Sequence, residues 1–173
     1  MSKKFSPLAW LLQCNEDKMK KLNNRAILIV DDDTRMLRAL EKVLAGEGAT
    51  VTVAQWAGDA LDFLTARKSP VDLVITDLRM PFVSGMTVVY AIHKIFPKLP
   101  IIVLTAFGGP DVKAECLRQG AADFLEKPLN TATLLGVLER VFATHPAGTR
   151  PVQMSGDEKV EGFTEHMETN KTG

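Results

Sequence analysis

The sequence predicts a doubly wound α/β fold, in which helices cover both faces of a five-stranded parallel sheet. Between residues 25 and 142, five short runs of apolar and β-branched residues alternate with segments of helical periodicity. Most of these runs are continuously apolar, which is typical of strands that are covered on both faces. Five consecutive β-α units imply right-handed crossovers, and the common strand order for a domain of this size is 2-1-3-4-5.

The first two strands are expected at Ala26–Val30 and Thr50–Ala54. Asp33 is expected to cap the helix between them, since aspartate is a preferred N-cap residue. The apolar positions of this helix are spaced for one face, and the helix should end near Gly46 and Gly48. The next helix carries a shorter stripe, which consists of Ala60, Leu61 and Leu64.

The second half of the domain repeats the pattern, with strands expected at Val71–Thr76, Ile101–Leu104 and Ala121–Glu126. The helix around residues 112–118 has few apolar positions, which suits a mobile element better than a core one. Asn130 is expected to cap the final helix. Two helices carry wide apolar stripes, at Val88, Val89, Ile92, Ile95 and Phe96 and at Leu134, Leu135, Val137, Leu138, Val141 and Phe142.

The domain itself is expected to span residues 25–144. Residues 1–24 are expected to form a flexible extension, within which Met19 offers an alternative translation start. Residues 145–173 lack a periodic pattern, which predicts a disordered tail with one short helix around Asp157–Met167. The tail is too short for a second enzyme domain or a conventional DNA-binding output domain.

The composition excludes several functional classes. Lys plus Arg equals Asp plus Glu, at 21 each, so the net charge of zero argues against a mainly electrostatic nucleic-acid binder. No apolar stretch approaches the length that spans a bilayer. Cys14 and Cys116 are too few and too far apart in sequence for a disulfide framework, so we expect a cytoplasmic protein.

Polar side chains follow four of the five predicted strands, at the point where each strand ends. The sequence Asp31–Asp33 follows the first strand, Asp77 the third, Thr105 the fourth and Lys127 the fifth. Because the carboxyl ends of parallel strands share one edge, these groups are expected to converge. The first and third strands flank the topological switch point, where ligands bind in such folds.

Clustered carboxylates of this kind predict a site for Mg²⁺ or Mn²⁺, which prefer oxygen ligands. Asp32 and Asp77 could bind the metal directly, and Asp31 directly or through water. The backbone carbonyl oxygen of Arg79 could be the last metal ligand that the protein supplies. Mutual repulsion among the carboxylates favours cation binding, because the cation relieves it.

The same residues predict phosphate chemistry. Asp77 can act as a carboxylate nucleophile on phosphorus, giving an aspartyl phosphate. Lys127 is a mobile point charge that can pair with phosphoryl oxygens, and the Thr105 hydroxyl can donate to them. A cis peptide bond before Pro128 would aim the lysine inward.

These motifs together resemble the receiver domain of two-component response regulators, whose fold is the flavodoxin-like, or CheY-like, (βα)5 arrangement. The resemblance covers residues 25–142 and rests on four segments: Ile-Leu-Ile-Val-Asp31-Asp32-Asp33, Asp72-Leu-Val-Ile-Thr-Asp77-Leu-Arg-Met-Pro81, Ile-Ile-Val-Leu-Thr105-Ala106 and Asp123-Phe-Leu-Glu-Lys127-Pro128. The runs Asp77-Leu-Arg-Met-Pro81 and Thr105-Ala-Phe-Gly108 look most like receivers of nitrogen-control transcription regulators.

The resemblance implies Mg²⁺-dependent phosphotransfer to Asp77 from a sensor histidine kinase or a histidine phosphotransfer protein, with slow self-catalysed hydrolysis. It also implies that Thr105 and Phe124 move together as a switch, which changes the partners of the face formed by the fourth helix, fifth strand and fifth helix. The protein is then a signalling switch rather than an enzyme, with an unidentified downstream protein partner and homodimerisation on phosphorylation as a further expectation. As a residue of the last strand, Phe124 could equally be a core residue.

Two other functions fit parts of the pattern. Asp31-x-Asp33 resembles the first motif of haloacid-dehalogenase-like phosphatases, with Asp31 as nucleophile. However, Arg35 stands where that motif has Thr or Val, and no acidic pair follows the fourth strand. The other alternative is a receiver-like scaffold regulated without phosphate, which would have no need of mutually repelling carboxylates.

Overall fold

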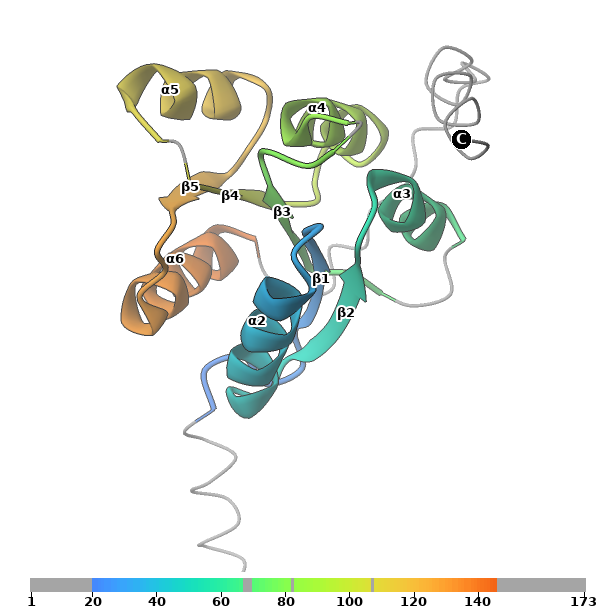
Figure 1. Cartoon of the computed structure of the whole chain (residues 1–173). Coiled ribbons are helices and arrows are strands. Elements are labelled where there is room, and N and C mark those ends of the chain that lie inside the picture. The colour runs from blue at the N-terminus through green and yellow to red at the C-terminus, as the bar shows by residue number, and fades with distance from the viewer. Residues whose placement is uncertain (1–19, 67–69, 82, 107, 146–173) are drawn as a thin grey trace, which may run out of the picture.

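The computed structural model describes residues 20–66, 70–81, 83–106 and 108–145, which form three layers with a sheet in the middle (Figure 1). All five strands of this sheet run parallel, in the order β2-β1-β3-β4-β5, which confirms the predicted fold class and strand order. The strands are β1 (Ala26–Val30), β2 (Thr50–Ala54), β3 (Leu73–Asp77), β4 (Ile101–Thr105) and β5 (Asp123–Glu126).

Helices cover both faces of the sheet, as Figure 1 shows. One face is covered by α2 (Thr34–Gly46) and α6 (Thr131–Thr144). The other is covered by α3 (Ala57–Thr65), α4 (Gly85–Ile95) and α5 (Pro110–Arg118). Within the described ranges, no helix combines the length and the apolar character needed to cross a bilayer.

Alternation along the strands sends successive side chains into two separate cores. In β1, Ile27 and Ile29 pack in the core beneath α2 and α6. Leu28 and Val30 pack in the core beneath α3, α4 and α5. Both sets are buried, which explains why the strand reads as one continuous apolar run.

Four strand boundaries differ from the prediction. β3 begins at Leu73 rather than Val71, and the Asp72 side chain accepts a hydrogen bond from the Ala26 amide at 2.8 Å. β5 begins at Asp123 rather than Ala121, because the Ala121 amide bonds back to the Cys116 carbonyl at the end of α5. β3 and β4 each end one residue later than expected, so that Asp77 and Thr105 are themselves strand residues.

The N-terminal boundary of the domain differs from the prediction. Leu22, assigned above to the flexible extension, is fully buried in the core beneath α2 and α6, and its amide bonds to the Glu47 carbonyl at 3.0 Å. The folded unit therefore begins before Arg25. The alternative start at Met19, the rest of the extension and the tail with its short helix lie outside the described residues.

Helix α5 is thinly packed, as its sequence indicated. Cys116 is its one buried residue, whereas Val112 is half-buried and Leu117 is 43% exposed. Helix α6, by comparison, buries six apolar residues. Since apolar burial is what holds a helix to a sheet, α5 is the helix that moves at least cost in buried area.

Gly85, the first residue of α4, packs directly on the end of β3. A Cβ atom added to it would lie 1.9 Å from the Asp77 carbonyl oxygen, a backbone atom that cannot easily give way. We expect Gly85→Ala to lower the free energy of unfolding by about 2–3 kcal/mol, as overpacking does. The control is Gly136→Ala in α6, where nothing lies within 4 Å. This change should raise stability by about 0.5–1 kcal/mol, and equal denaturation midpoints for the two variants would contradict the close packing.

Candidate functional site

Strand alternation places three predicted site residues on the same side of the sheet. Asp31 follows Ile27 and Ile29 at intervals of two residues, so its side chain points to the same side of the sheet as theirs. Asp77 follows Leu73 and Ile75 in the same way. Lys127 likewise follows two residues after Leu125. All three therefore project from the carboxyl edge of the sheet on the side covered by α2 and α6.

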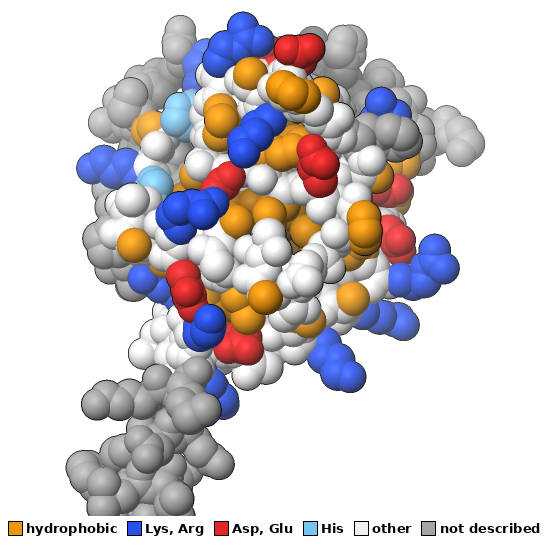
Figure 2. Space-filling view, turned by 90° about the vertical axis from the view of Figure 1, so that its left-hand side faces the viewer, with side chains coloured by type: hydrophobic (Ala, Val, Ile, Leu, Met, Phe, Trp, Pro, Cys, Tyr) orange, Lys and Arg blue, Asp and Glu red, His pale blue; other side chains and the backbone are white. Residues whose placement is uncertain are grey.

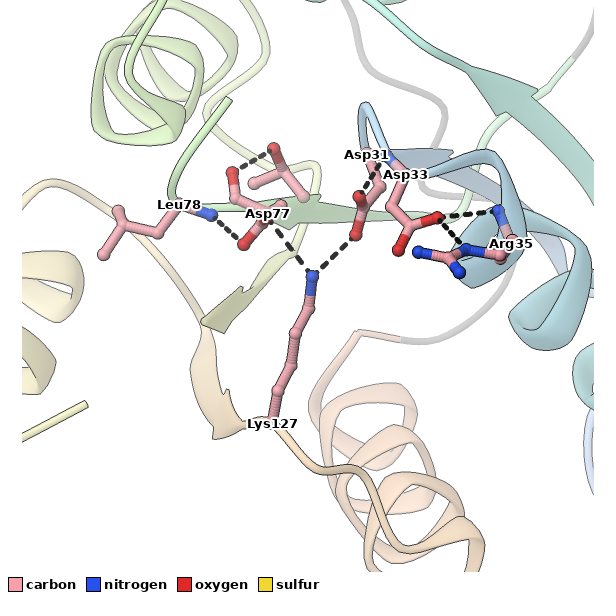
Figure 3. A network of polar contacts seen from close by, with 7 residues as sticks. Asp31, Asp33, Arg35, Asp77, Leu78 and Lys127 are labelled. Atoms are coloured by element: carbon pink, nitrogen blue, oxygen red, sulfur yellow. Dashed lines mark hydrogen bonds and ion pairs between the residues drawn. The ribbon is translucent and has the colours of Figure 1, made fainter. Parts of the chain in front are cut away.

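The Lys127 ammonium bridges the two aspartates, as Figure 3 shows. Its Nζ donates a hydrogen bond to Asp31 Oδ2 at 2.8 Å and lies 3.2 Å from Asp77 Oδ2. The Asp31 side chain is 1% exposed, that of Asp77 11% and that of Lys127 15%. Low exposure makes this charge network strong, because water screens it little.

Two opposing effects act on the pKa of Lys127. Burial disfavours the charged ammonium and lowers the pKa, whereas the hydrogen bond and charge of Asp31, and then those of Asp77, raise it. The carboxylates prevail, so the pKa of Lys127 lies above its ordinary value. The lysine is therefore a fixed positive charge at neutral pH.

Backbone amides hold the two carboxylates from behind. Asp33 N donates to Asp31 Oδ1 at 2.9 Å, and Leu78 N donates to Asp77 Oδ1 at 2.7 Å. In Asp31 and in Asp77, one carboxylate oxygen therefore accepts a hydrogen bond from a backbone amide, and the other oxygen faces Lys127. These donors could not be predicted from the sequence, because every residue except proline carries a backbone amide.

Three carboxylates form the group that could hold a metal ion. One oxygen each of Asp31, Asp32 and Asp77 can be chosen so that all lie within 4.8 Å of one another. Asp32 is half-buried and the other two are buried. An all-oxygen set of clustered carboxylates fits a hard cation such as Mg²⁺. The structure thus brings together the three aspartates that the sequence proposed as ligands.

Asp33 does not join this group. Its side chain accepts a hydrogen bond from the Arg35 amide at 2.9 Å and caps α2, as predicted. The same carboxylate pairs with the Arg35 side chain at 3.5 Å, on the exposed side of the loop. These contacts lower the pKa of Asp33, with the backbone hydrogen bond from Arg35 as the main cause.

The remaining predicted residues lie on β4, on β5 and in the loops that follow β3 and β5. Thr105 is fully buried at the end of β4, and its carbonyl accepts from the Lys127 amide at 2.7 Å. Phe124 is buried in the core beneath α3, α4 and α5. Arg79 lies two residues after Asp77 and pairs with Ser84 just before α4. The peptide bond between Lys127 and Pro128 is cis, as expected.

The fold and the acidic carboxyl edge together define a signalling domain of the receiver type. Residues 27–139 match the family model of the response regulator receiver domain, and this chain belongs to that family. The family serves two-component signal transduction, in which its members are switches rather than enzymes. Phosphorylation and Mg²⁺ binding through an acidic pocket are typical of it.

Curated relatives match this chain over part of their own length. The chain is 33% identical over 132 residues to the DNA-binding transcriptional regulator NtrC of Escherichia coli strain K12, covering 75% of this chain and 28% of that protein. It is 37% identical over 117 residues to the transcriptional regulatory protein ZraR of Salmonella typhimurium, covering 68% of this chain and 26% of ZraR. The chain thus spans about a quarter of the length of these relatives.

Solved receiver structures agree with the fold. A response regulator receiver domain protein from Clostridium thermocellum superimposes with a TM-score of 0.65 at 30% identity, covering 69% of this chain and 95% of that one. The beryllofluoride-activated receiver domain of NtrC4, solved as a dimer, gives a TM-score of 0.64 at 26% identity, covering 69% of this chain and 98% of that one.

Proposed function

We propose that Asp77 accepts a phosphoryl group from a sensor histidine kinase or a histidine phosphotransfer protein, and that this changes how the domain binds a downstream protein. The observation that carries the proposal is the position of the Asp77 carboxylate. It ends β3, lies 3.2 Å from Lys127 Nζ and shares a group with Asp31 and Asp32. We also propose that the reaction takes place in the cytoplasm, as the family's role suggests.

In the proposed step an Asp77 oxygen forms a bond to phosphorus while the bond from phosphorus to the donor histidine nitrogen breaks. Asp77 Oδ1 is held by the Leu78 amide, so Oδ2, which faces Lys127, is the better placed nucleophile. Lys127 can then pair with the arriving phosphoryl oxygens without leaving the site. Asp31 keeps its own hydrogen bond to Lys127 and holds the lysine in place.

The metal ligands of the proposal are Asp32, Asp77, Asp31 and the Arg79 carbonyl. When bound, Mg²⁺ or Mn²⁺ would offset the negative charge of the carboxylates and of the transferring group. The clustering of three carboxylates around one ammonium supports this, because a single lysine cannot neutralise three negative charges.

Thr105 and Phe124 are proposed to carry the signal away from the site. Thr105 lies two residues after Val103 in β4, so the two side chains point to the same side of the sheet. Val103 pairs with Phe124 in β5. Both residues are therefore on the side of the sheet that α3, α4 and α5 cover. The thin packing of α5 on this side leaves it free to shift. Phe124 is also a core residue, so the two interpretations of its role are compatible.

The phosphatase alternative loses support from the position of Asp33. That mechanism requires the second aspartate of Asp31-x-Asp33 to act beside the first as an acid and base. Here the Asp33 carboxylate caps α2 and pairs with Arg35, and it is not in the acidic group. A phosphate-independent scaffold remains the other candidate, and phosphorylation of the protein as described next would exclude it.

The proposed acceptor can be located directly by mass spectrometry. The protein is incubated with acetyl phosphate and Mg²⁺, the acyl phosphate is trapped by borohydride reduction, and the peptides are sequenced. We expect the modification on Asp77, and none when the metal is removed by EDTA. Modification of Asp31 instead would contradict the proposal, and modification of neither aspartate would favour the scaffold.

Asp32 offers a test of the metal site that does not depend on phosphorylation. It carries a negative charge beside Asp31 and Asp77, whereas Lys127 pairs with those two residues. We expect Asp32→Asn to raise the stability of the metal-free protein by about 0.5–1 kcal/mol, because it removes repulsion within the cluster. It should also weaken Mg²⁺ binding about tenfold or more, as measured by thermal shift against Mg²⁺ concentration. Unchanged binding would show that Asp32 is not a ligand.

A further inference from the structure

A groove of about 340 Å³ lies at the end of the domain opposite the acidic site. It opens between the ends of α4, α5 and α6 and the start of β5, and its volume is at the small end of the range for ligand pockets. Its walls are largely apolar, formed by Pro97, Leu99, Pro100, Ala122 and Val141. Gly120, with φ at 102°, lets the His93 ring pack against the backbone at its edge.

The polar side chains of this groove are mostly basic. Arg140, His93 and His145 line it. Lys94 and Lys98 are adjacent in sequence to lining residues, and so is Glu139, which pairs with Lys21. Its one acidic residue, Asp123, is already paired with Arg140. In Figure 2 the pale blue histidine side chains lie at the left of the view, near Lys and Arg side chains. The groove is thus apolar inside, and the net positive charge at its rim comes from Lys94 and Lys98, because the charges of Arg140 and Asp123 balance.

We propose that this groove is the docking site for the chain's own segment 157–168. The segment contains five acidic residues and one lysine, so its net charge is −4, opposite to that of the rim. Its three large apolar residues, Val160, Phe163 and Met167, are spaced at i, i+3 and i+7 and would lie on one face of a helix. An acidic helix with one apolar face matches an apolar groove with a basic rim.

Chain connectivity favours this occupant over others. Helix α6 ends at Thr144, and both Thr144 and His145 line the groove, so the chain leaves the domain at the groove itself. Eleven residues separate His145 from Asp157, which allows a span of up to about 36 Å. A tethered segment also binds at a high effective concentration. Segment 1–19 has a net charge of +1, so the rim would not attract it.

Docking can be measured on the full chain by paramagnetic broadening. A nitroxide label is attached at Thr169→Cys in a Cys14→Ser background, where the remaining Cys116 is fully buried and protected. We expect the amides of Gly120, Ala122 and Thr144 to lose most of their intensity relative to the reduced label. The amides around the acidic site at the opposite end should be unaffected.

Two pairs of variants test the apolar and charged contacts separately. Val160→Ser/Phe163→Ser/Met167→Ser should restore the groove amides, whereas the matched control Val152→Ser, outside the segment, should leave them broadened. Arg140→Glu should restore them too, whereas Arg38→Glu, an exposed position on α2 outside the groove, should not. The Arg140 side chain is 64% exposed, so its replacement should not unfold the domain, and circular dichroism checks this.

Three results would overturn the proposal. Broadening of the groove amides that survives the triple serine variant would show that the apolar face does not dock. Absence of broadening in the parent protein would exclude docking altogether. Broadening in a mixture of labelled protein and unlabelled ¹⁵N protein, at the level seen within one chain, would assign the groove to a second copy.

Discussion

Replacing the proposed acceptor, Asp77→Asn, is expected to reduce phosphate incorporation from acetyl phosphate to background, on the order of 100-fold or more. The carboxamide is nearly isosteric with the carboxylate, and it can still accept the Leu78 amide hydrogen bond. Folding should therefore be preserved while the nucleophile is lost. The measurement is phosphoprotein mass in the presence of Mg²⁺, with circular dichroism as the check on folding.

The matched control for this experiment is Asp33→Asn. Asp33 lies in the same acidic run as Asp31 and Asp32, but its side chain caps α2 and faces away from the group. Asparagine caps helices as well as aspartate does, so this variant should be phosphorylated like the parent protein. Phosphorylation that survives Asp77→Asn and disappears in Asp31→Asn would overturn the assignment and revive the phosphatase alternative.

Replacing the bridging lysine, Lys127→Met, should destabilise the metal-free protein by about 2–3 kcal/mol, below the 3–5 kcal/mol typical of fully buried pairs. Asp31 is 1% exposed and accepts a hydrogen bond from Lys127, and removing the ammonium leaves its charge buried beside two other carboxylates. Methionine preserves most of the packing volume. The loss can be measured by urea denaturation in EDTA.

Magnesium distinguishes an electrostatic effect from a packing effect. Without the ammonium the three carboxylates repel one another more strongly, so Mg²⁺ should bind more tightly and stabilise Lys127→Met more than the parent protein. Lys113→Met, an exposed position on α5, is the control and should show no such difference. If Mg²⁺ stabilised both variants equally, the lysine would not be neutralising the site.

The pH dependence of the same difference follows from the raised pKa of Lys127. A group whose pKa is raised in the folded protein stabilises it fully below the unfolded pKa, and this contribution is lost as pH rises through the folded value. The stability gap between the parent protein and Lys127→Met should therefore be constant near neutral pH. It should begin to close only above the ordinary lysine pKa of 10.5.

The architecture and the members of the site were predictable because both depend on the same short pattern. A buried parallel strand reads as a continuous apolar run, so the residue at which the run stops marks the carboxyl edge of the sheet. Asp77 and Lys127 were found in this way, whereas the order of the strands was taken from the order common to folds of this size. The helix caps at Asp33 and Asn130 follow from short-range hydrogen bonding, which the sequence also encodes locally.

What the sequence missed depends on contacts between distant segments. Leu22 reads as an isolated apolar residue in a polar stretch, and only the packing of α2 and α6 shows that it is a core residue. Gly85 reads as a loop glycine, yet its lack of a Cβ is what lets α4 begin against the Asp77 carbonyl. The basic groove joins the ends of three helices that are far apart in the chain.

The core is divided into two halves, and the division separates the proposed phosphoacceptor site from the residues proposed to carry its signal. Asp31, Asp77 and Lys127 project on the side of α2 and α6, whereas Thr105 and Phe124 belong to the opposite side. The sheet lies between these two groups of side chains. We expect that exposed positions of α4 and α5, away from Gly85, can be substituted for a new partner without disturbing the acidic group. Such a domain can exchange partners over evolutionary time while it keeps one reaction.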